Sequence, residues 1–219
     1  MKWEKIKKLY NKNYIDFYKQ LLLTIMEEDS EKCENIKGSE SNPFSSYVEL
    51  SNRHCNKRFK NVQMCTIKHF YPTILYNIIN YYRFNYKSFP NAYKEIYEKY
   101  ISSEDVELNN ILKKWLNMTF GMINNNIIFS TKDINFDIVR TSHKILKKIH
   151  EEFKESIIYI DTDSIYFLYS PYIKEYLKNL SYDVEFENID NMIFFRKKRY
   201  IQWENDINEK VKIKGFQTI

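Results

Sequence analysis

The chain has 219 residues, 43% of them hydrophobic and 17% aromatic, which is enough apolar mass for one domain or for a core with a small appendage. Lys and Arg number 34 and Asp and Glu 29, so the net charge of +5 permits a polyanionic partner without requiring one. Three cysteines, an odd number, do not suit a secreted disulfide framework, and no run approaches the ~20 apolar residues of a membrane span. We therefore expect an intracellular protein with no membrane partner.

The start of the chain is expected to be helical. Apolar residues recur there at helical spacing, and the segment that follows, 27–43, is polar and reads as a loop. The recurring residues are Tyr14, Phe17, Leu21, Leu22 and Ile25.

The segment VQMCTIKHFYPTIL changes from a strand pattern to a helix pattern. We expect a strand to end near Thr66 or Ile67 and a helix to follow Pro72, because the missing N–H of proline would be unpaired in the first turn of a helix anyway. A further helix, AYKEIYEKYI, should stop at Ser102-Ser103.

The remaining part mixes helices with strand patterns. A helix should start with Glu104 and Asp105, whose negative charge suits a helix N-terminus, and another should cover about 136–155. Two short strands are expected in SIIYIDTDSIYFLY around a polar turn, followed by a helix near 172–180. The last segments, MIFFRKKRYIQWE and KVKIKGF, are rich in strand formers.

Asp161 and Asp163 stand at the tip of the expected hairpin. In an extended segment, residues two apart point to the same face, so the two carboxylates would lie together. Close carboxylates repel each other, and a divalent cation that prefers oxygen ligands, Mg²⁺ or Mn²⁺, relieves the repulsion. The alternative is an ordinary turn in which Asp and Ser hydrogen-bond their own backbone.

LKKWLNMTFG places a cation, an amide and a glycine on one helical face. Lys113, Asn117 and Gly121 are spaced i, i+4 and i+8, while Leu112 and Trp115 point elsewhere. Such a face could receive a phosphate chain and a flat base. The alternative is a solvated stripe with a glycine that ends the helix.

Basic residues gather in RKKRYIQ and KVKIKG. Four consecutive cations beside Tyr200, followed by alternating lysines, fit a strand whose outer face follows a phosphate backbone. The alternative is a charged edge strand that resists aggregation.

These motifs, in this order, resemble those of the palm and fingers of family B DNA polymerases. YIDTDSIYF is similar to the third motif of that family, Tyr-Gly-Asp-Thr-Asp-Ser, with Ile160 where Gly is common. LKKWLNMTFG is similar to the second, Lys-x-x-x-Asn-Ser-x-Tyr-Gly, with Met118 replacing Ser and Phe120 replacing Tyr.

Two further motifs extend the resemblance to residues 62–215. TIKHFYPTIL is similar to the first motif, Asp-x-x-Ser-Leu-Tyr-Pro, with Tyr71 and Pro72 in register. RKKRYIQ is similar to the Lys-x-Tyr motif through Lys198 and Tyr200, and its ending resembles the protein-primed branch found in phages and linear plasmids.

The resemblance implies an α+β fold of the polymerase palm type, an antiparallel sheet with packed helices, and a short helical fingers hairpin. It divides the chain into a helical N-terminal extension and loop (1–61), palm with the first motif (62–86), short fingers (87–122), and palm with the third motif and the basic strand (123–219).

The resemblance also implies template-directed nucleotidyl transfer to a DNA primer terminus, in viral or plasmid replication. The implied partners are primer–template DNA, a deoxynucleoside triphosphate, and a second polymerase subunit or a terminal protein; the implied cofactor is Mg²⁺ or Mn²⁺, held by Asp161 and Asp163. The implied nucleotide-binding residues are Lys113, Asn117, Phe120 and Tyr71, and the implied DNA-binding residues are Lys198, Tyr200, Arg196 and Lys214.

The first motif departs from the family pattern, because Thr66 stands where its metal-binding Asp is expected. A neutral hydroxyl cannot bridge two ions as a carboxylate does, so we expect impaired activity. Because the segments before Thr66 and after Gly215 are short, we also expect this sequence to lack exonuclease and thumb domains. Two alternatives to an active polymerase core follow: a catalytically silent nucleic-acid-binding subunit or one half of a split polymerase, and a remnant with a structural role. For an active core, the hairpin tip, the Lys113 helix and the Tyr71-Pro72 turn should converge on one cleft.

Overall fold

A computed structural model describes residues 47–50, 54–82, 84, 87–124, 133–204 and 211–216. The helices and the loop expected over the first 43 residues lie outside these ranges. The chain divides into two compact units. We call residues 1–44 and 71–138 the helical unit, and residues 45–70 and 139–219 the sheet unit.

The helical unit contains the helices predicted from Pro72 and from Asp105. The helix at Pro72 begins two residues earlier than expected, so that the proline lies in its first turn, and Asp105 caps its helix because its Oδ1 accepts a hydrogen bond from the Leu108 N–H at 3.1 Å. The preceding helix ends at Ser102, as predicted. The bounds are α3, Phe70–Ile78; α4, Phe89–Ser102; α5, Val106–Asn124; and α6, Asp133–Glu152, which continues into the sheet unit.

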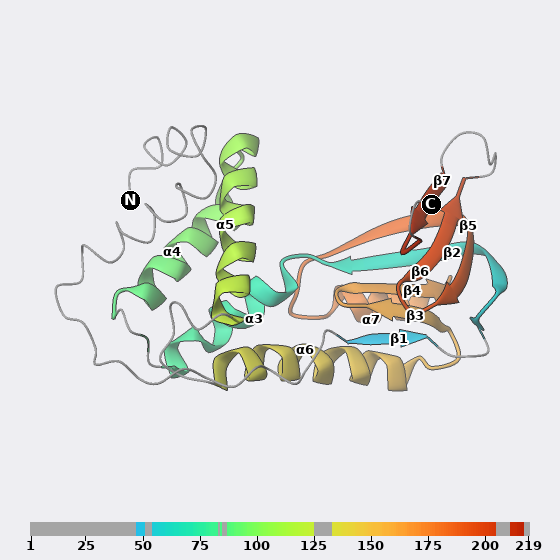
Figure 1. Ribbon diagram of the computed structural model, residues 1–219, viewed down its shortest axis with the longest axis horizontal. Coiled ribbons are helices and arrows are strands. Elements are labelled where there is room, and N and C mark those ends of the chain that lie inside the picture. Colours follow the sequence, from blue (N-terminus) through green and yellow to red (C-terminus); the bar gives the residue numbers. More distant parts are fainter. Residues whose placement is uncertain are drawn as a thin grey trace. The chain divides into compact units, whose positions relative to one another are not determined.

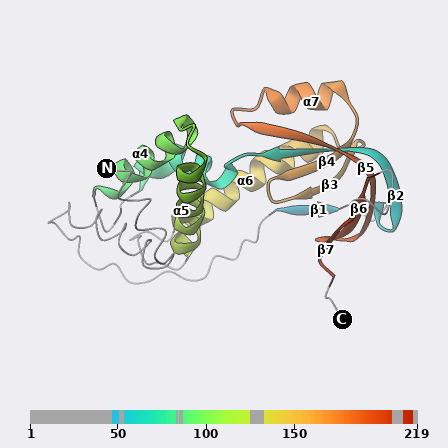
Figure 2. The same cartoon turned by 90° about the horizontal axis from the view of Figure 1, so that it is seen from above.

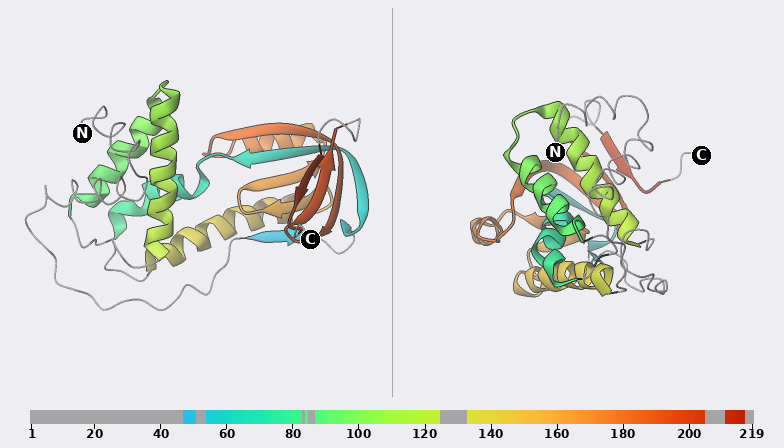
Figure 3. Two further views of the ribbon diagram at one scale, coloured as in Figure 1. Left: turned by 45° about the horizontal axis from the view of Figure 1, so that its top comes forward. Right: turned by 90° about the vertical axis from the view of Figure 1, so that its left-hand side faces the viewer.

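Aromatic residues hold the helices of this unit together. Tyr93 of α4 is fully buried, packs against Trp115 of α5 with ring centroids 6.0 Å apart, and donates its hydroxyl proton to the carbonyl of Pro72 at 3.2 Å. α4 and α5 lie beside each other (Figure 3). One buried tyrosine therefore links three helices.

The sheet unit is built on a sheet of seven described strands, all antiparallel, in the order β1-β3-β4-β2-β5-β6-β7 (Figure 1). The predicted hairpin forms β3 and β4. The bounds are β1, Val48–Leu50; β2, Lys57–Ile67; β3, Ile157–Asp161; β4, Ser164–Leu168; β5, Val184–Arg196; β6, Arg199–Trp203; and β7, Val211–Lys214. The α+β fold with an antiparallel sheet is therefore confirmed.

One face of the sheet is covered by helices. Cys65, Ile165 and Ile160 are paired across β2, β4 and β3, and all three are fully buried. α7, Pro171–Lys178, lies along this face (Figure 2), with Lys174 Nζ 5.2 Å from the ring centre of Phe186. All five residues of β3 are buried, and burial on both faces explains why β3 reads as a continuous apolar run.

The opposite face curls around an aromatic cluster. Tyr159, Tyr166, Phe194 and Tyr200 are almost fully buried, with pairs of ring centroids 4.9–6.3 Å apart. Within β2, Asn61 has a left-handed φ of 52°, which is uncommon for a residue other than glycine. We refer to these four residues as the aromatic cluster; they fill the inside of the curl.

Two contacts hold the curl closed at the β5–β6 turn. The Lys198 N–H donates to the Tyr159 hydroxyl of β3 at 2.8 Å, and Lys197 Nζ lies 3.6 Å from Glu49 Oε2 of β1. In the strand order, β1 and β3 are separated from β5 and β6 by β4 and β2. The curl therefore brings distant strands into contact, which no pattern in the sequence indicates.

Candidate functional site

The β3–β4 hairpin tip is fixed by backbone hydrogen bonds. The Asp163 N–H donates to the Asp161 carbonyl at 2.7 Å, and the Thr162 N–H donates to the Tyr47 carbonyl at 2.9 Å. Thr162 has a φ of 66°, in the left-handed region, which a two-residue hairpin turn requires. Asp161 therefore ends one strand and Asp163 precedes the next.

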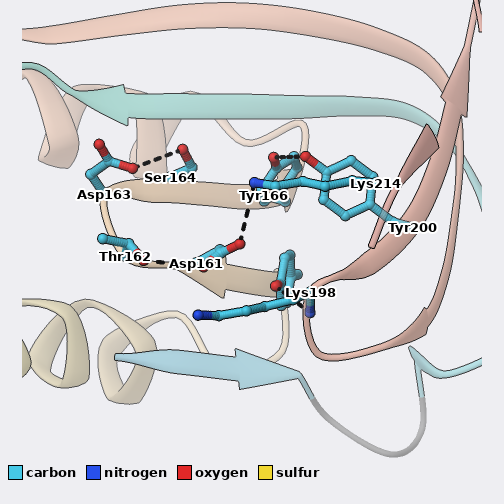
Figure 4. A network of polar contacts seen from close by, with 9 residues as sticks. Asp161, Thr162, Asp163, Ser164, Tyr166, Lys198, Tyr200 and Lys214 are labelled. Atoms are coloured by element: carbon cyan, nitrogen blue, oxygen red, sulfur yellow. Dashed lines mark hydrogen bonds and ion pairs between the residues drawn. The ribbon is translucent and has the colours of Figure 1, made fainter. Parts of the chain in front are cut away.

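The two carboxylates at the tip have different partners (Figure 4). Asp161 Oδ1 accepts from the Thr162 hydroxyl at 3.1 Å, and its Oδ2 lies 3.6 Å from Lys214 Nζ. Asp163 Oδ1 accepts from the Ser164 hydroxyl at 3.3 Å. The predicted hairpin tip is present, and the left-handed turn at Thr162 places Asp161 at the end of β3 and Asp163 in the turn before β4.

Strand pairing brings the first and third motifs together. Thr66 of β2 lies opposite Ser164 of β4, and the Ile67 N–H donates to the Asp163 carbonyl at 2.8 Å. On its other side, Thr66 lies opposite Glu185 of β5. Since paired residues share a face of the sheet, Asp161, Ser164, Thr66 and Glu185 form one row across four strands.

Burial and nearby charges act on Asp163 at the hairpin tip and on the carboxylates of this row. Burial raises the pKa of Asp163, an effect that the Ser164 hydroxyl and the positive charge of Lys214 oppose. At the far end of the row, Lys68 Nζ lies 3.4 Å from Glu185 Oε2. Two carboxylates of the row, Asp161 and Glu185, thus each face a lysine ammonium.

The residues at the tip do not fit the two-metal site that the resemblance implies. Mg²⁺ in such sites is bound by carboxylate oxygens, but Thr66 offers a neutral hydroxyl and Asp161 lies beside the ammonium of Lys214. Within the described residues, no group of three or more His, Cys, Asp or Glu could hold a metal ion. The donors that the described part of the chain offers at the tip are therefore too few and too well neutralised for two ions.

The basic run RKKRYIQ folds differently from the single strand we expected. Arg196 ends β5, Lys197 and Lys198 form a turn in which Lys198 has a φ of 62°, and Arg199 begins β6. Tyr200 is 1% exposed and its hydroxyl lies 3.2 Å from that of Tyr166, so it supports this region from the core. The predicted pairing with KVKIKG is present, since β6 pairs with β7.

Sequence reasoning missed the ion pair between Lys214 and Asp161, although one signal pointed to the region. Gly215 is one of only three glycines in the chain, and it has a φ of 78°. A Cβ added there would lie 2.0 Å from the Lys198 carbonyl oxygen, so the position requires glycine. Gly215 thereby allows the end of β7 to approach the β5–β6 turn.

The polar stripe predicted on α5 is present in the helical unit. Lys113, Asn117 and Gly121 are exposed, whereas Leu112 and Trp115 are buried. α5 continues past Gly121 to Asn124, so this glycine does not end the helix, and a Cβ added to it would meet nothing within 4 Å. No packing contact among the described residues explains why glycine stands here.

Two predicted nucleotide-binding residues meet in the helical unit. The rings of Tyr71 on α3 and Phe120 on α5 have centroids 4.8 Å apart and are tilted by 32°. Both are partly exposed, so they form an aromatic surface beside the stripe of α5. Asp161, Asp163, Lys198 and Lys214 belong to the sheet unit, and the convergence of the two sets of residues stays a prediction.

No protein-family model and no curated protein matches the chain in sequence. Its structure, however, matches solved ones. The family B DNA polymerase from the hyperthermophilic archaeon Pyrobaculum calidifontis matches with a TM-score of 0.64 and 17% identity, over 91% of this chain and 32% of that chain. The phi29 DNA polymerase in an orthorhombic crystal form matches with a TM-score of 0.62 and 10% identity, over 91% of this chain and 59% of that chain.

The fold is that of the family B DNA polymerase core. A phi29 DNA polymerase complex with primer–template DNA and incoming nucleotide substrates also matches, with a TM-score of 0.59 and 11% identity over 92% of this chain and 59% of that one. The chain thus spans only 32–59% of the length of these polymerases. Among the described residues, no helix is long and apolar enough to cross a membrane.

Proposed function

We propose that this chain binds primer–template DNA with its palm-like sheet unit and, by itself, extends primers poorly. The observation that supports this most strongly is the pairing of Thr66 with Ser164, next to Asp163. The first and third motifs thus adjoin as they would in a polymerase palm, while the residue at the first-motif position is not an acid.

Basic residues around the curl supply the proposed contacts to DNA. Arg196 and Lys198 lie at the β5–β6 turn, and Lys214 lies at the end of β7, with its Nζ 3.6 Å from Asp161 Oδ2. Lysine and arginine side chains neutralise phosphates and position a duplex. We propose that Tyr200 supports these basic residues from the core, since its ring is buried.

The helical unit would bind the incoming deoxynucleoside triphosphate. Lys113 is proposed to contact its phosphates, because its ammonium is exposed on the stripe of α5. Tyr71, Phe120 and Asn117 would contact the sugar and the base, since flat rings and amides suit both. A second polymerase subunit or a terminal protein is a further proposed partner, as is an origin in viral or plasmid replication.

The catalytic activity that we propose is weaker than the resemblance implies. Mg²⁺ or Mn²⁺ at Asp161 and Asp163 would supply charge neutralisation for phosphoryl transfer. The residues at the tip do not fit these ions, because the Lys214 ammonium already neutralises Asp161. A second subunit could supply the acid that Thr66 lacks, as expected for one half of a split polymerase.

DNA binding is tested by fluorescence anisotropy with a labelled primer–template over a range of salt concentrations. We expect affinity to fall steeply with salt, and Lys198→Ala to weaken binding by about 10-fold and to reduce the salt slope by about 1. Lys147→Ala is the matched control, because this exposed lysine of α6 pairs with Glu151 on the same helix. Wild-type binding that is absent or independent of salt would contradict the proposal.

Primer extension tests the catalytic part of the proposal. With Mg²⁺ or Mn²⁺ supplied, we expect the wild type and Thr66→Asp to extend poorly, because Lys214 still neutralises Asp161 in both. Thr66→Asp with Lys214→Met should extend faster by about 10-fold or more, and the further change Asp163→Ala should abolish the gain. Efficient extension by the wild type, lost in Asp163→Ala, would instead establish an active polymerase core.

A further inference from the structure

Lys214 occupies an unusual place in the sheet. It ends β7, opposite Tyr200 of β6, at the edge of the sheet farthest in strand order from β1 and β3. Four strands, β4, β2, β5 and β6, separate it from β3 in that order. The curl nevertheless brings its ammonium to the end of β3.

The surroundings of Lys214 direct its side chain. Its Nζ lies 3.6 Å from Asp161 Oδ2 and 5.7 Å from the ring centre of Tyr200 (Figure 4). Gly215 follows directly, and since a Cβ there would lie 2.0 Å from the Lys198 carbonyl oxygen, the absence of a side chain lets the end of β7 come close to the turn. A cation–π contact and an ion pair therefore act on one ammonium.

Asp161 requires such a partner. Its side chain is only 9% exposed, so an uncompensated negative charge there would be costly, whereas the side chain of Lys214 is 53% exposed and remains partly hydrated. In the residue row of the candidate site, the position that would complete a divalent site holds the neutral Thr66. The negative charge of Asp161 is thus already neutralised by the positive charge of Lys214.

We propose that Lys214 is an internal counter-ion that takes the place of a divalent cation at Asp161. The inference deepens the proposed function and rests on it: the palm binds DNA with its hairpin tip neutralised by its own lysine, so neither folding nor binding requires Mg²⁺. A divalent ion next to Asp161 would face the positive charge of Lys214 in a partly buried setting, where like charges repel more strongly than in water. Replacing both Lys214 and Thr66 should therefore open a divalent site.

The experiment measures Mn²⁺ binding by electron paramagnetic resonance and melting temperature by differential scanning fluorimetry, with EDTA or Mn²⁺ present. For the wild type we expect no bound Mn²⁺ and equal melting temperatures in both conditions. Lys214→Met should lower the melting temperature in EDTA by roughly 2–4 °C, and Lys214→Met with Thr66→Asp should bind Mn²⁺ and regain that loss when Mn²⁺ is added.

Two controls keep the result interpretable. Lys212→Met removes a lysine from the same strand, two residues from Lys214, and should behave as the wild type; Lys214→Arg keeps the charge and should also exclude Mn²⁺. Wild-type protein that binds Mn²⁺ through Asp161, with binding lost in Asp161→Asn, overturns the inference. So does a folded double variant that binds no Mn²⁺.

DNA affinity in EDTA separates this inference from the proposed function. Equal primer–template binding in EDTA and in Mg²⁺ supports both. Binding that appears only with Mg²⁺ overturns the counter-ion role and leaves DNA binding intact. Absence of DNA binding in either condition overturns the proposed function, while the Mn²⁺ measurements still decide the role of Lys214.

Discussion

The hairpin tip of the sheet unit and the stripe of α5 in the helical unit hold their polar residues in different ways. At the tip, Asp161 and Thr66 are fixed by strand pairing on either side, and they lie next to the buried aromatic cluster. On α5, Lys113 and Asn117 project from the exposed side of one helix, and the packing contacts come from the opposite side. Substitutions at the tip should therefore change stability and binding together, whereas those on α5 should change binding alone.

The largest effect should come from the support of the tip. Tyr159→Ala removes a fully buried ring that packs against Tyr166 and Phe194, and also the acceptor of the Lys198 N–H. We expect a loss of about 3–5 kcal/mol in the free energy of unfolding, measured by urea denaturation. Lys113→Ala in the helical unit is the comparison and should stay within about 0.5 kcal/mol of wild type. Similar losses for the two variants would remove the distinction between the regions.

The two described glycines offer a matched pair across the same regions. Gly215→Ala places a Cβ 2.0 Å from the Lys198 carbonyl oxygen at a φ of 78°, so it should destabilise the protein by about 1–3 kcal/mol. Gly121→Ala lies in a helix with nothing within 4 Å of the added Cβ, and should stabilise it by about 0.5–1 kcal/mol. Denaturant titrations of both variants measure this, and changes of the same sign would contradict the comparison.

Substitutions on α5 are expected to change nucleotide binding without changing the stability of the protein. Lys113→Ala should weaken deoxynucleoside triphosphate binding by about 10-fold, because it removes an exposed ammonium proposed to contact phosphates. Isothermal titration calorimetry measures the affinity, and Lys114→Ala, which removes the neighbouring exposed lysine, is the control. Equal losses in the two variants would indicate a general charge effect in place of a specific contact.

Local signals in the sequence predicted the helices and strands well. They did not predict contacts between residues that are far apart in the sequence. The cap at Asp105, the stop at Ser102 and the β3–β4 hairpin depend on residues close in sequence, and all three are present. The start of β2 at Lys57 was missed because its first residues are polar and exposed. The contact of Lys214 with Asp161 depends on the curl of the whole sheet, which no local pattern encodes.

The smallest effect should appear in the pH dependence of stability. Burial raises the pKa of Asp163 in the folded protein, so between its unfolded pKa and this raised value the folded state binds more protons than the unfolded state. Stability attributable to Asp163 is therefore full below the unfolded pKa and is lost as the pH rises through the folded pKa. Asp163→Asn removes the charge, and should raise the melting temperature at pH 7 by roughly 1–2 °C.

The same variant should show no gain at a pH below the unfolded pKa of about 4, where the wild-type carboxyl is already protonated. Melting curves recorded from about pH 3 to pH 8 measure this convergence, with Asp183→Asn as a control on the loop before β5. A loss of stability in Asp163→Asn at pH 7 would show that the contacts of the carboxylate outweigh the cost of its burial. The charged carboxylate of Asp163 would then stabilise the tip. The tip and α5 would differ only in that strand pairing fixes the polar residues of one, whereas those of the other project from an exposed helix side.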